Sequence, residues 1–434
     1  MKKFVVVLAI LAVSAAVVFA NGQNEQGDEV IELRFQEHSN ESRNVHIRRA
    51  LQVFEEQNPN IRVSFEEVPW ANIRERVLTQ AAGGDLPDVT YLAQLMVPSV
   101  AAEGILTPLD ELIARDAEEV NLDDFNPAGL APFRIDGSLY ALTSDFAGAA
   151  MLAYNRQILD DAGIGVPPTD WDIDDFERVL IEVSQDTDGD GSNDIWGLAE
   201  NPTSDLRFVD NFLKRNDESI FVRDAENNVT GVAIDSPGAH QIIQRLADLH
   251  HEYDAAPAAF GQQVPRFQIG SAAFAVTVGA TVLGEYRETL DFPWGLTVLP
   301  EGFGSDPTAS FIYCAGYAMP VDRDNEDAAW ELLKWMTSED GMRIAVIDSG
   351  FSLPPRRSLE DEFFARNADI EGIESIAISL DQVSGDVLHP GAINPYFPQV
   401  NSFLTRALEA VALGDQTAQD AIEGVMPQIE AVFQ

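Results

Sequence analysis

The chain has 434 residues, of which 72 are Asp or Glu and 27 are Lys or Arg, so its formal net charge at pH 7 is −45. Such a surface repels nucleic acids and anionic lipids, because their binding depends on clustered basic residues. With 45% apolar residues the chain is expected to fold rather than stay disordered. Our hypothesis for the acidity is a saline habitat, in which salt screens the self-repulsion.

The first twenty residues have the pattern of a secretory signal peptide. Lys2 and Lys3 precede the apolar run 4–13, and Val18-Phe19-Ala20 provides a small-residue cleavage site. We expect residues 1–20 to be removed, and residues 21–29 to form a polar tether; a buried N-terminal helix is the alternative. The only cysteine, Cys314, lies far downstream, which excludes an internal disulfide and a lipid anchor on the new N-terminus. An exported, soluble protein in the periplasm or another extracytoplasmic compartment is therefore expected.

The mature chain begins with alternating strand and helix patterns. Apolar residues alternate over 31–35 and 61–65, "DVTYL" (88–92) is expected to be a third strand, and apolar residues recur at helical spacing over 47–54 and 73–81. This β-α-β-α-β order predicts a parallel sheet with right-handed crossovers. Ligands of such sheets bind beyond the carboxyl ends of the strands.

The later chain mixes further helices with strands. Helical patterns occupy 168–185 and 324–341, and residues 406–433 read as two helices. The chain has neither a G-x-S-x-G elbow nor a P-loop, and "HHEYDA" (250–255) lacks the second histidine of a zinc protease. We therefore expect no enzyme, although an exported glycan hydrolase with an unmarked carboxylate pair is an alternative.

Eight stretches, in order, carry a resemblance to a known family. They are "FEEQNPNIRVSFEEVPW" (54–70), "AAGGDLPDVTYL" (81–92), "DGSLYAL" (136–142), "LAYNRQILDDAGIGVPPTDW" (152–171), "FQIGSAAFAVTVGA" (267–280), "WGLTVLPEG" (294–302), "AAWELLKWMTSEDG" (328–341) and "SGFSLPPRRS" (349–358). Together they resemble the family 1 extracellular solute-binding proteins, the sugar-binding subunits of bacterial ABC importers.

The resemblance implies a two-lobed α/β fold of the periplasmic-binding-protein type (type II-like). Two mixed sheets flanked by helices would be joined by hinge strands and would close over a solute. By the family's pattern, 30–142 and 275–321 would form the N-terminal lobe, and 143–274 and 322–434 the C-terminal lobe. The implied function is capture of a sugar or oligosaccharide by a monomer that delivers it to the membrane permease subunits of an ABC importer.

The sequence departs from the family's pattern at two places that concern the ligand. Relatives commonly have a tryptophan where this chain has Thr281 and Val282, and tryptophan-rich residues where the first strand ends "FQEHS". The solute could therefore be a polyol, a polyamine or a glycerol-phosphate compound instead of a sugar. A sensor that presents its ligand to a receptor would have the same fold.

The candidate ligand-binding residues come from strand ends and from the resemblance. Sugars are held by aromatic rings and by planar polar groups, both of which occur where the expected strands end. Gly279 would let the backbone approach a ligand closely. By resemblance, Asp145 and Phe146 match a segment next to the hinge, and Ser310 and Phe311 a ligand-contacting turn. The full set is Glu37, His38, Asn40, Trp70, Gln94, Asp145, Phe146, Gly279, Ser310 and Phe311.

The stretch "DTDGDGSND" (186–194) has the pattern of a calcium loop. Asp186, Asp188 and Asp190 occupy positions 1, 3 and 5, Ser192 position 7 and Asp194 position 9. Position 12, normally glutamate, is Gly197, so the pattern predicts a weak structural calcium site without a catalytic role. A solvated turn is the alternative, and no other cofactor is expected.

Overall fold

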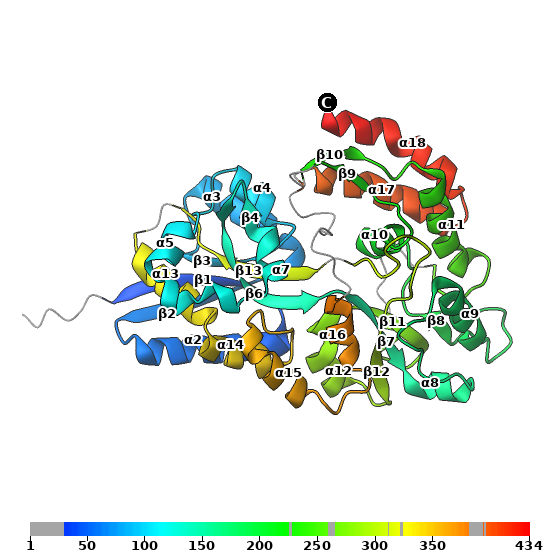
Figure 1. Ribbon diagram of the computed structural model, residues 1–434, viewed down its shortest axis with the longest axis horizontal. Helices are drawn as coiled ribbons and strands as arrows, with labels where there is room; N and C mark the ends of the chain where they lie inside the picture. Colours follow the sequence, from blue (N-terminus) through cyan, green and yellow to red (C-terminus); the bar gives the residue numbers. More distant parts are fainter. Residues whose placement is uncertain are drawn as a thin grey trace, which may run out of the picture.

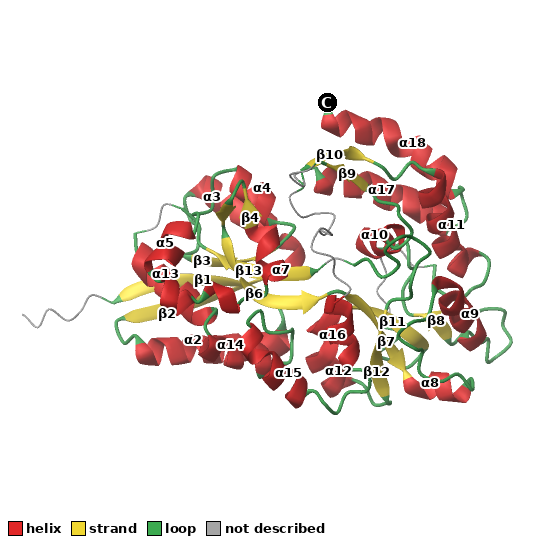
Figure 2. Cartoon of the chain, in the orientation of Figure 1, coloured by secondary structure: helices red, strands yellow, loops and turns green. Residues whose placement is uncertain are grey.

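The computed structural model describes residues 30–224, 228–258, 265–310, 312–321, 324–381, 394 and 396–434. Two α/β lobes stand side by side, each with its own sheet, and the C-terminal helices cover the upper part of the second lobe (Figures 1 and 2). The expected fold of two mixed sheets flanked by helices is confirmed. The proposed signal peptide and tether lie outside the described residues.

The first lobe contains a five-stranded sheet in the order β2-β1-β3-β13-β6. β1 pairs in parallel with β2 and β3, as the alternating sequence pattern predicted, whereas β13 runs antiparallel to β3 and β6. The strands are β1 (Ile31–His38), β2 (Ile61–Val68), β3 (Val89–Ala93), β6 (Ala141–Gly148) and β13 (Tyr313–Ala318).

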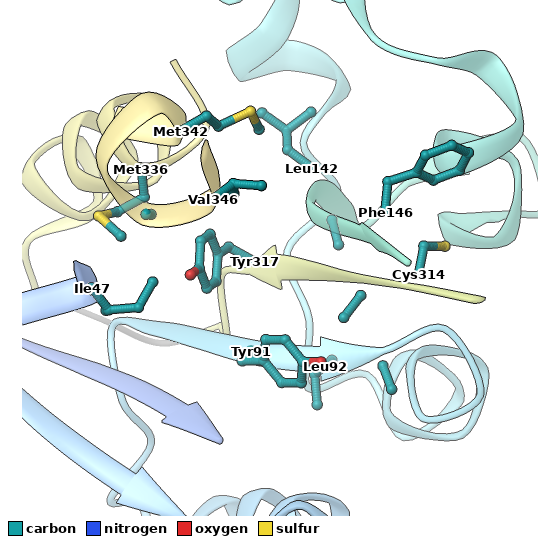
Figure 3. Close-up of a cluster of buried hydrophobic side chains, with 14 of the residues drawn as sticks. Ile47, Tyr91, Leu92, Leu142, Phe146, Cys314, Tyr317, Met336, Met342 and Val346 are labelled. Carbon is teal, nitrogen blue, oxygen red and sulfur yellow. The ribbon is translucent and has the colours of Figure 1, made fainter. Parts of the chain in front are cut away.

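Helices cover both faces of this sheet. Helix α2 begins where the Asn40 side chain accepts a hydrogen bond from the Arg43 backbone N–H, and it buries Ile47, Leu51 and Phe54 against the sheet. Figure 3 shows part of the core, with Tyr317 of β13 beside Met336 and Val346. The helices are α2 (Glu41–Gln57), α3 (Ile73–Gly83), α4 (Val97–Ala102), α5 (Asp110–Arg115), α6 (Ala117–Val120), α7 (Pro127–Leu130), α13 (Glu326–Met336), α14 (Glu339–Met342) and α15 (Glu360–Arg366). The short helical turns are η1 (Trp70–Asn72), η2 (Leu122–Asp124), η3 (Ala131–Phe133), η5 (Arg343–Ile347) and η6 (Arg357–Leu359). A small hairpin consists of β4 (Arg134–Ile135) and β5 (Ser138–Leu139).

The second lobe contains a four-stranded sheet in the order β12-β7-β11-β8. One face carries the α9, α10, α11, α17 and α18 core, and α12 and α16 lie at the other side (Figure 1). The strands are β7 (Ala150–Asn155), β8 (Trp196–Leu198), β11 (Ala272–Val278) and β12 (Trp294–Val298), and a separate hairpin consists of β9 (Phe221–Arg223) and β10 (Val229–Val232). The helices are α8 (Arg156–Asp161), α9 (Ile173–Val183), α10 (Leu206–Lys214), α11 (Pro237–His251), α12 (Leu283–Thr289), α16 (Glu374–Asp381), α17 (Phe397–Ala412) and α18 (Ala418–Glu430). The short helical turns are η4 (Gly279–Val282) and η7 (Ala431–Phe433).

The chain is divided between the lobes differently from the expected boundaries. β11 and β12 both pair along β7, which places 275–298 in the second lobe instead of the first. β6 pairs with β13, and α13 packs on α2, so 143–148 and 326–336 belong to the first lobe. The reason is that backbone pairing and buried apolar faces, here Trp330 and Leu333, decide lobe membership, and neither can be read from the order of motifs.

In the part of the chain that the structure describes, none of the helices combines the length and apolarity needed to cross a membrane.

Candidate functional site

A cleft between the lobes contains two adjoining cavities. The inner one, of about 360 Å³, is lined by His38, Asn40, Trp70, Tyr91, Ala93, Gln94, Leu95, Asp145, Ala147, Arg207, Val278, Thr281, Val282, Glu285, Tyr313, Cys314 and Phe351. The outer one, of about 500 Å³, shares Trp70, Leu95 and Arg207 with it and extends toward the start of α17. Both volumes are within the range of small-molecule sites.

The topology of the first sheet explains which polar residues reach this cleft. His38 ends β1, Trp70 begins η1 two residues after β2, and Gln94 directly follows β3. These three strands are parallel neighbours, so their carboxyl ends meet at one edge of the sheet. Asn40 follows β1 as the cap of α2, and Asp145 comes from β6. The structure thus brings five of the expected residues to one cavity.

Glu37 lies beneath the cavity and does not line it. Its Oε1 accepts from Arg43 Nη1 at 2.9 Å and from the His38 backbone N–H at 2.8 Å, and its Oε2 accepts from the Tyr317 hydroxyl at 2.8 Å. Burial pushes the pKa of Glu37 upward, but Arg43 and His38 outweigh burial and hold the pKa below its ordinary value. Glu37 is therefore a fixed anion under the cleft floor.

Arg43 connects this anion to Asp145. Arg43 Nη2 lies 3.0 Å from Asp145 Oδ2, without hydrogen-bond geometry, and the guanidinium carbon is 4.9 Å from the Phe351 ring centre and 5.4 Å from that of Tyr91. Burial lowers the pKa of Arg43, and the two carboxylates more than reverse this effect. Burial raises the pKa of Asp145, and Arg43 only partly opposes it.

Phe146, Gly279 and Ser310 lie outside the cavity lining. Phe146 is buried in the first-lobe core and is hydrogen-bonded through its backbone to Leu353. Gly279 has φ +50°, and a Cβ there would lie 1.5 Å from the Ala147 carbonyl oxygen, so its role is close backbone packing. Ser310 is fully buried and donates to Asn211 Oδ1 at 3.1 Å. Phe311 lies outside the described residues.

Sequence reasoning missed several residues of the lining. Tyr91 lies inside β3, Arg207 is the second residue of α10, and Phe351 lies in a loop after η5. Glu285 comes from α12 and Tyr313 from the start of β13. Tyr91 and Phe351 lie in stretches that carry the family resemblance, 81–92 and 349–358, and this was the available signal; Arg207, Glu285 and Tyr313 lie outside those stretches. Thr281 and Val282 also line the cavity, at the place where the resemblance implies a tryptophan.

The aspartate loop lies on the surface of the second lobe between α9 and β8. Asp186, Asp188 and Asp194 each bring one carboxylate oxygen into a group whose atoms lie within 4.8 Å of one another. Asp190 is not in this group and accepts from the Ser192 backbone N–H at 2.9 Å, while the three clustered carboxylates also accept backbone N–H groups of the loop. At position 12, a Cβ on Gly197 would lie 2.4 Å from the Leu180 carbonyl oxygen, so no longer side chain fits there. Three oxygens without the twelfth ligand suit a weak cation site.

The sequence matches the family of bacterial extracellular solute-binding proteins over residues 49–372. The chain therefore belongs to the bacterial extracellular solute-binding proteins, which are binding proteins of transport systems. It is 24% identical over 401 residues to the mannitol-binding protein of Pseudomonas aeruginosa, covering 89% of this chain and 88% of that protein.

Two solved structures share the fold. An ABC substrate-binding protein from Listeria monocytogenes in complex with cycloalternan superposes with a TM-score of 0.80 at 22% identity, covering 93% of this chain and 99% of the other. The maltose/maltodextrin-binding domain from Bdellovibrio bacteriovorus bound to maltotriose gives a TM-score of 0.76 at 21% identity, with 92% and 99% coverage. At these identities the likeness concerns the fold.

Proposed function

We propose that this solute-binding protein captures a sugar or oligosaccharide between its lobes and delivers it unchanged to the permease of an ABC importer. The observation that carries the proposal is the combination of aromatic rings and planar polar groups around the interlobe cavity. Trp70, Tyr91, Tyr313 and Phe351 supply the rings, and Asn40 supplies an amide. Sugar C–H faces pack on aromatic rings, while hydroxyls hydrogen-bond to amides and carboxylates.

The availability of these groups differs between residues. Trp70 is 40% exposed at the junction of the two cavities, so its ring is free to receive a ligand. Gln94 already donates to the Ile312 carbonyl at 2.6 Å and accepts from Cys314 at 3.0 Å. The ring of Trp70 is therefore the expected main contact, and Gln94 is expected to fix the neighbouring backbone.

The ligands of the similar proteins support a polyhydroxylated solute. The two solved structures hold cycloalternan and maltotriose, and the curated relative is a mannitol-binding protein. A polyol is the second candidate because of this last relative. We also propose that residues 1–20 serve as an export signal, that the mature protein acts as a monomer, and that the aspartate loop holds a structural calcium ion.

Isothermal titration calorimetry of the mature chain against maltose, maltotriose, mannitol and sorbitol tests the proposal, with chromatography of the recovered ligand. We expect one series to bind and to be recovered intact. Trp70→Ala should weaken that binding at least about tenfold, or about 1.4 kcal/mol. Phe303→Ala is the matched control, since Phe303 is 60% exposed and lies outside both cavities. Cleavage of the glycan would favour the hydrolase, and binding of none of the four would contradict the proposal.

A further inference from the structure

The charges around the cleft are unequally matched. Glu37 and Asp145 share one guanidinium, since Arg43 Nη1 is 2.9 Å from Glu37 Oε1 and Arg43 Nη2 is 3.0 Å from Asp145 Oδ2. Glu37 receives further hydrogen bonds, whereas the buried Asp145 Oδ2 has no hydrogen-bond partner among the described residues. Asp145 is only 3% exposed and lines the inner cavity. The negative charge of Asp145 is therefore balanced by fewer hydrogen bonds and ion pairs than that of Glu37.

The other arginines that line the two cavities are already paired. Arg207 makes a bidentate contact with Asp205, with Nε 2.9 Å from Oδ1 and Nη2 2.5 Å from Oδ2. Arg74 Nη1 lies 2.6 Å from Glu75 Oε1, and Arg74 Nε donates to Ser99. Neither guanidinium carries uncompensated charge into the cleft.

Glu285 adds a further negative charge. It lines the inner cavity from α12, is exposed, and makes no ion pair with the residues that the structure describes. Among the residues that the structure describes, Glu37, Asp145 and Glu285 therefore face the guanidinium of Arg43 and the imidazole of His38, so the described part of the cleft carries excess negative charge. Burial is the main cause of the raised pKa of Asp145, and the neighbouring charge of Glu37 adds to it.

We propose that Asp145 and Glu285 set the charge selectivity of the cleft, which rejects anionic solutes and accepts neutral or amine-bearing polyhydroxy solutes. The inference rests on the proposed function and narrows its ligand class. An anion would lose its hydration without meeting a free cation among the described residues that line the two cavities, and it would approach two carboxylates at once. A hydroxyl or an ammonium would donate to them. Uronates, aldonates and glycerol-phosphate compounds are thereby excluded.

The test uses two matched trios of probes that differ only in charge-bearing groups. They are glucose, glucosamine and glucuronate, and sorbitol, glucamine and gluconate, titrated by calorimetry at one pH and one salt concentration. We expect the acid of a binding trio to bind on the order of a hundredfold more weakly than the neutral member, and the amine at least as tightly.

Two variants assign the effect to the named residues. Glu285→Lys changes an exposed side chain, and it should reduce the ratio of the affinity for the neutral probe to the affinity for the acidic probe by at least about tenfold. Glu288→Lys is the matched control: Glu288 is exposed on the same helix and outside the cavity lining, so the same change of net charge should leave the ratio unaltered. Asp145→Asn should also narrow the ratio.

The outcomes separate this inference from the proposed function. The inference would be overturned if an acid bound as tightly as its neutral counterpart. It would also be overturned if Glu285→Lys and Glu288→Lys changed the affinity ratio equally, and in both cases the sugar-binding function would remain supported. Failure of all six probes to bind would also overturn it, and the oligosaccharide titrations above would then decide the proposed function separately.

Discussion

Gly279 occupies a position in which only glycine fits. Its φ of +50° lies in the left-handed region, and a Cβ would lie 1.5 Å from the Ala147 carbonyl oxygen and 3.2 Å from the Gly148 Cα. Gly148, with φ +88°, lies at the passage from β6 to β7. The two glycines therefore let the strands of the two lobes approach closely beside the cleft.

Gly279→Ala should destabilise the fold by at least about 3 kcal/mol, because the backbone at Ala147 must move. Gly84→Ala is the control: Gly84 has φ +66° at the end of α3, but a Cβ added there would meet no atom within 4 Å, so only the conformational cost of about 1 kcal/mol applies. Chemical denaturation of both variants measures the difference. Equal losses would contradict the close contact.

At the scale of elements, Arg215 anchors the crossover between β12 and β13. It is buried at the end of α10, donates through Nη1 to the Leu299 and Pro300 carbonyls at 3.0 and 2.6 Å, and through Nε to the Ala309 carbonyl at 3.1 Å. Burial lowers its pKa to about 10, so the guanidinium stays charged at neutral pH. One side chain thus holds both ends of the segment 299–309, which leads from the second lobe to the first.

Arg215→Met should lower the free energy of unfolding by about 3–5 kcal/mol, because it leaves three buried carbonyls without a donor. Arg178→Met is the control: Arg178 is exposed on α9, and its pairs with Asp175 and Glu182 are worth about 0–1 kcal/mol. Urea unfolding monitored by tryptophan fluorescence compares them. A loss at Arg215 no larger than at Arg178 would show that the crossover is held by other contacts.

The aspartate loop is a second element with a testable role. Calcium on the order of 10⁻⁴ to 10⁻³ M should raise the thermal unfolding midpoint, and a chelator should reverse the shift. Asp186→Asn and Asp194→Asn should abolish the response, since both carboxylates belong to the oxygen cluster. Glu103→Gln, an exposed acid on another element, should leave it intact. Identical midpoints with calcium and chelator would make the loop a solvated turn.

At the scale of the whole molecule, the charge of −45 predicts a dependence on salt. Repulsion between like charges destabilises the compact state, and its range shortens from about 10 Å at 0.1 M salt to about 3 Å at 1 M. We expect the unfolding midpoint to rise when KCl is increased from about 0.1 M to about 1 M. Replacing KCl by sucrose separates screening from general osmolyte stabilisation. A midpoint that rises equally in both would contradict the saline-habitat hypothesis.

Local pattern determined much of the first lobe. The alternating apolar residues of 31–35 and 61–65 and the short apolar segment 88–92 predicted three strands, and the helical patterns between them predicted the parallel order that the structure has. Ligands of parallel sheets bind beyond the carboxyl ends of the strands, and the ends of neighbouring parallel strands lie side by side. This predicted that His38, Trp70 and Gln94 lie at the cleft, where the structure has them. These inferences needed only the order of elements.

Only the tertiary structure decided how distant segments meet. The pairing of β11 and β12 with β7 set the lobe boundaries, and Arg207, Glu285 and Phe351 joined the cavity from three separate elements. The sharing of Arg43 between Glu37 and Asp145 likewise joins β1, α2 and β6. Long-range backbone pairing and ion pairing leave no periodic trace in the chain, because each depends on contacts between residues far apart in sequence. The sequence by itself therefore determined the family, the local elements and part of the cleft, whereas the charge balance of the cleft was decided by the fold.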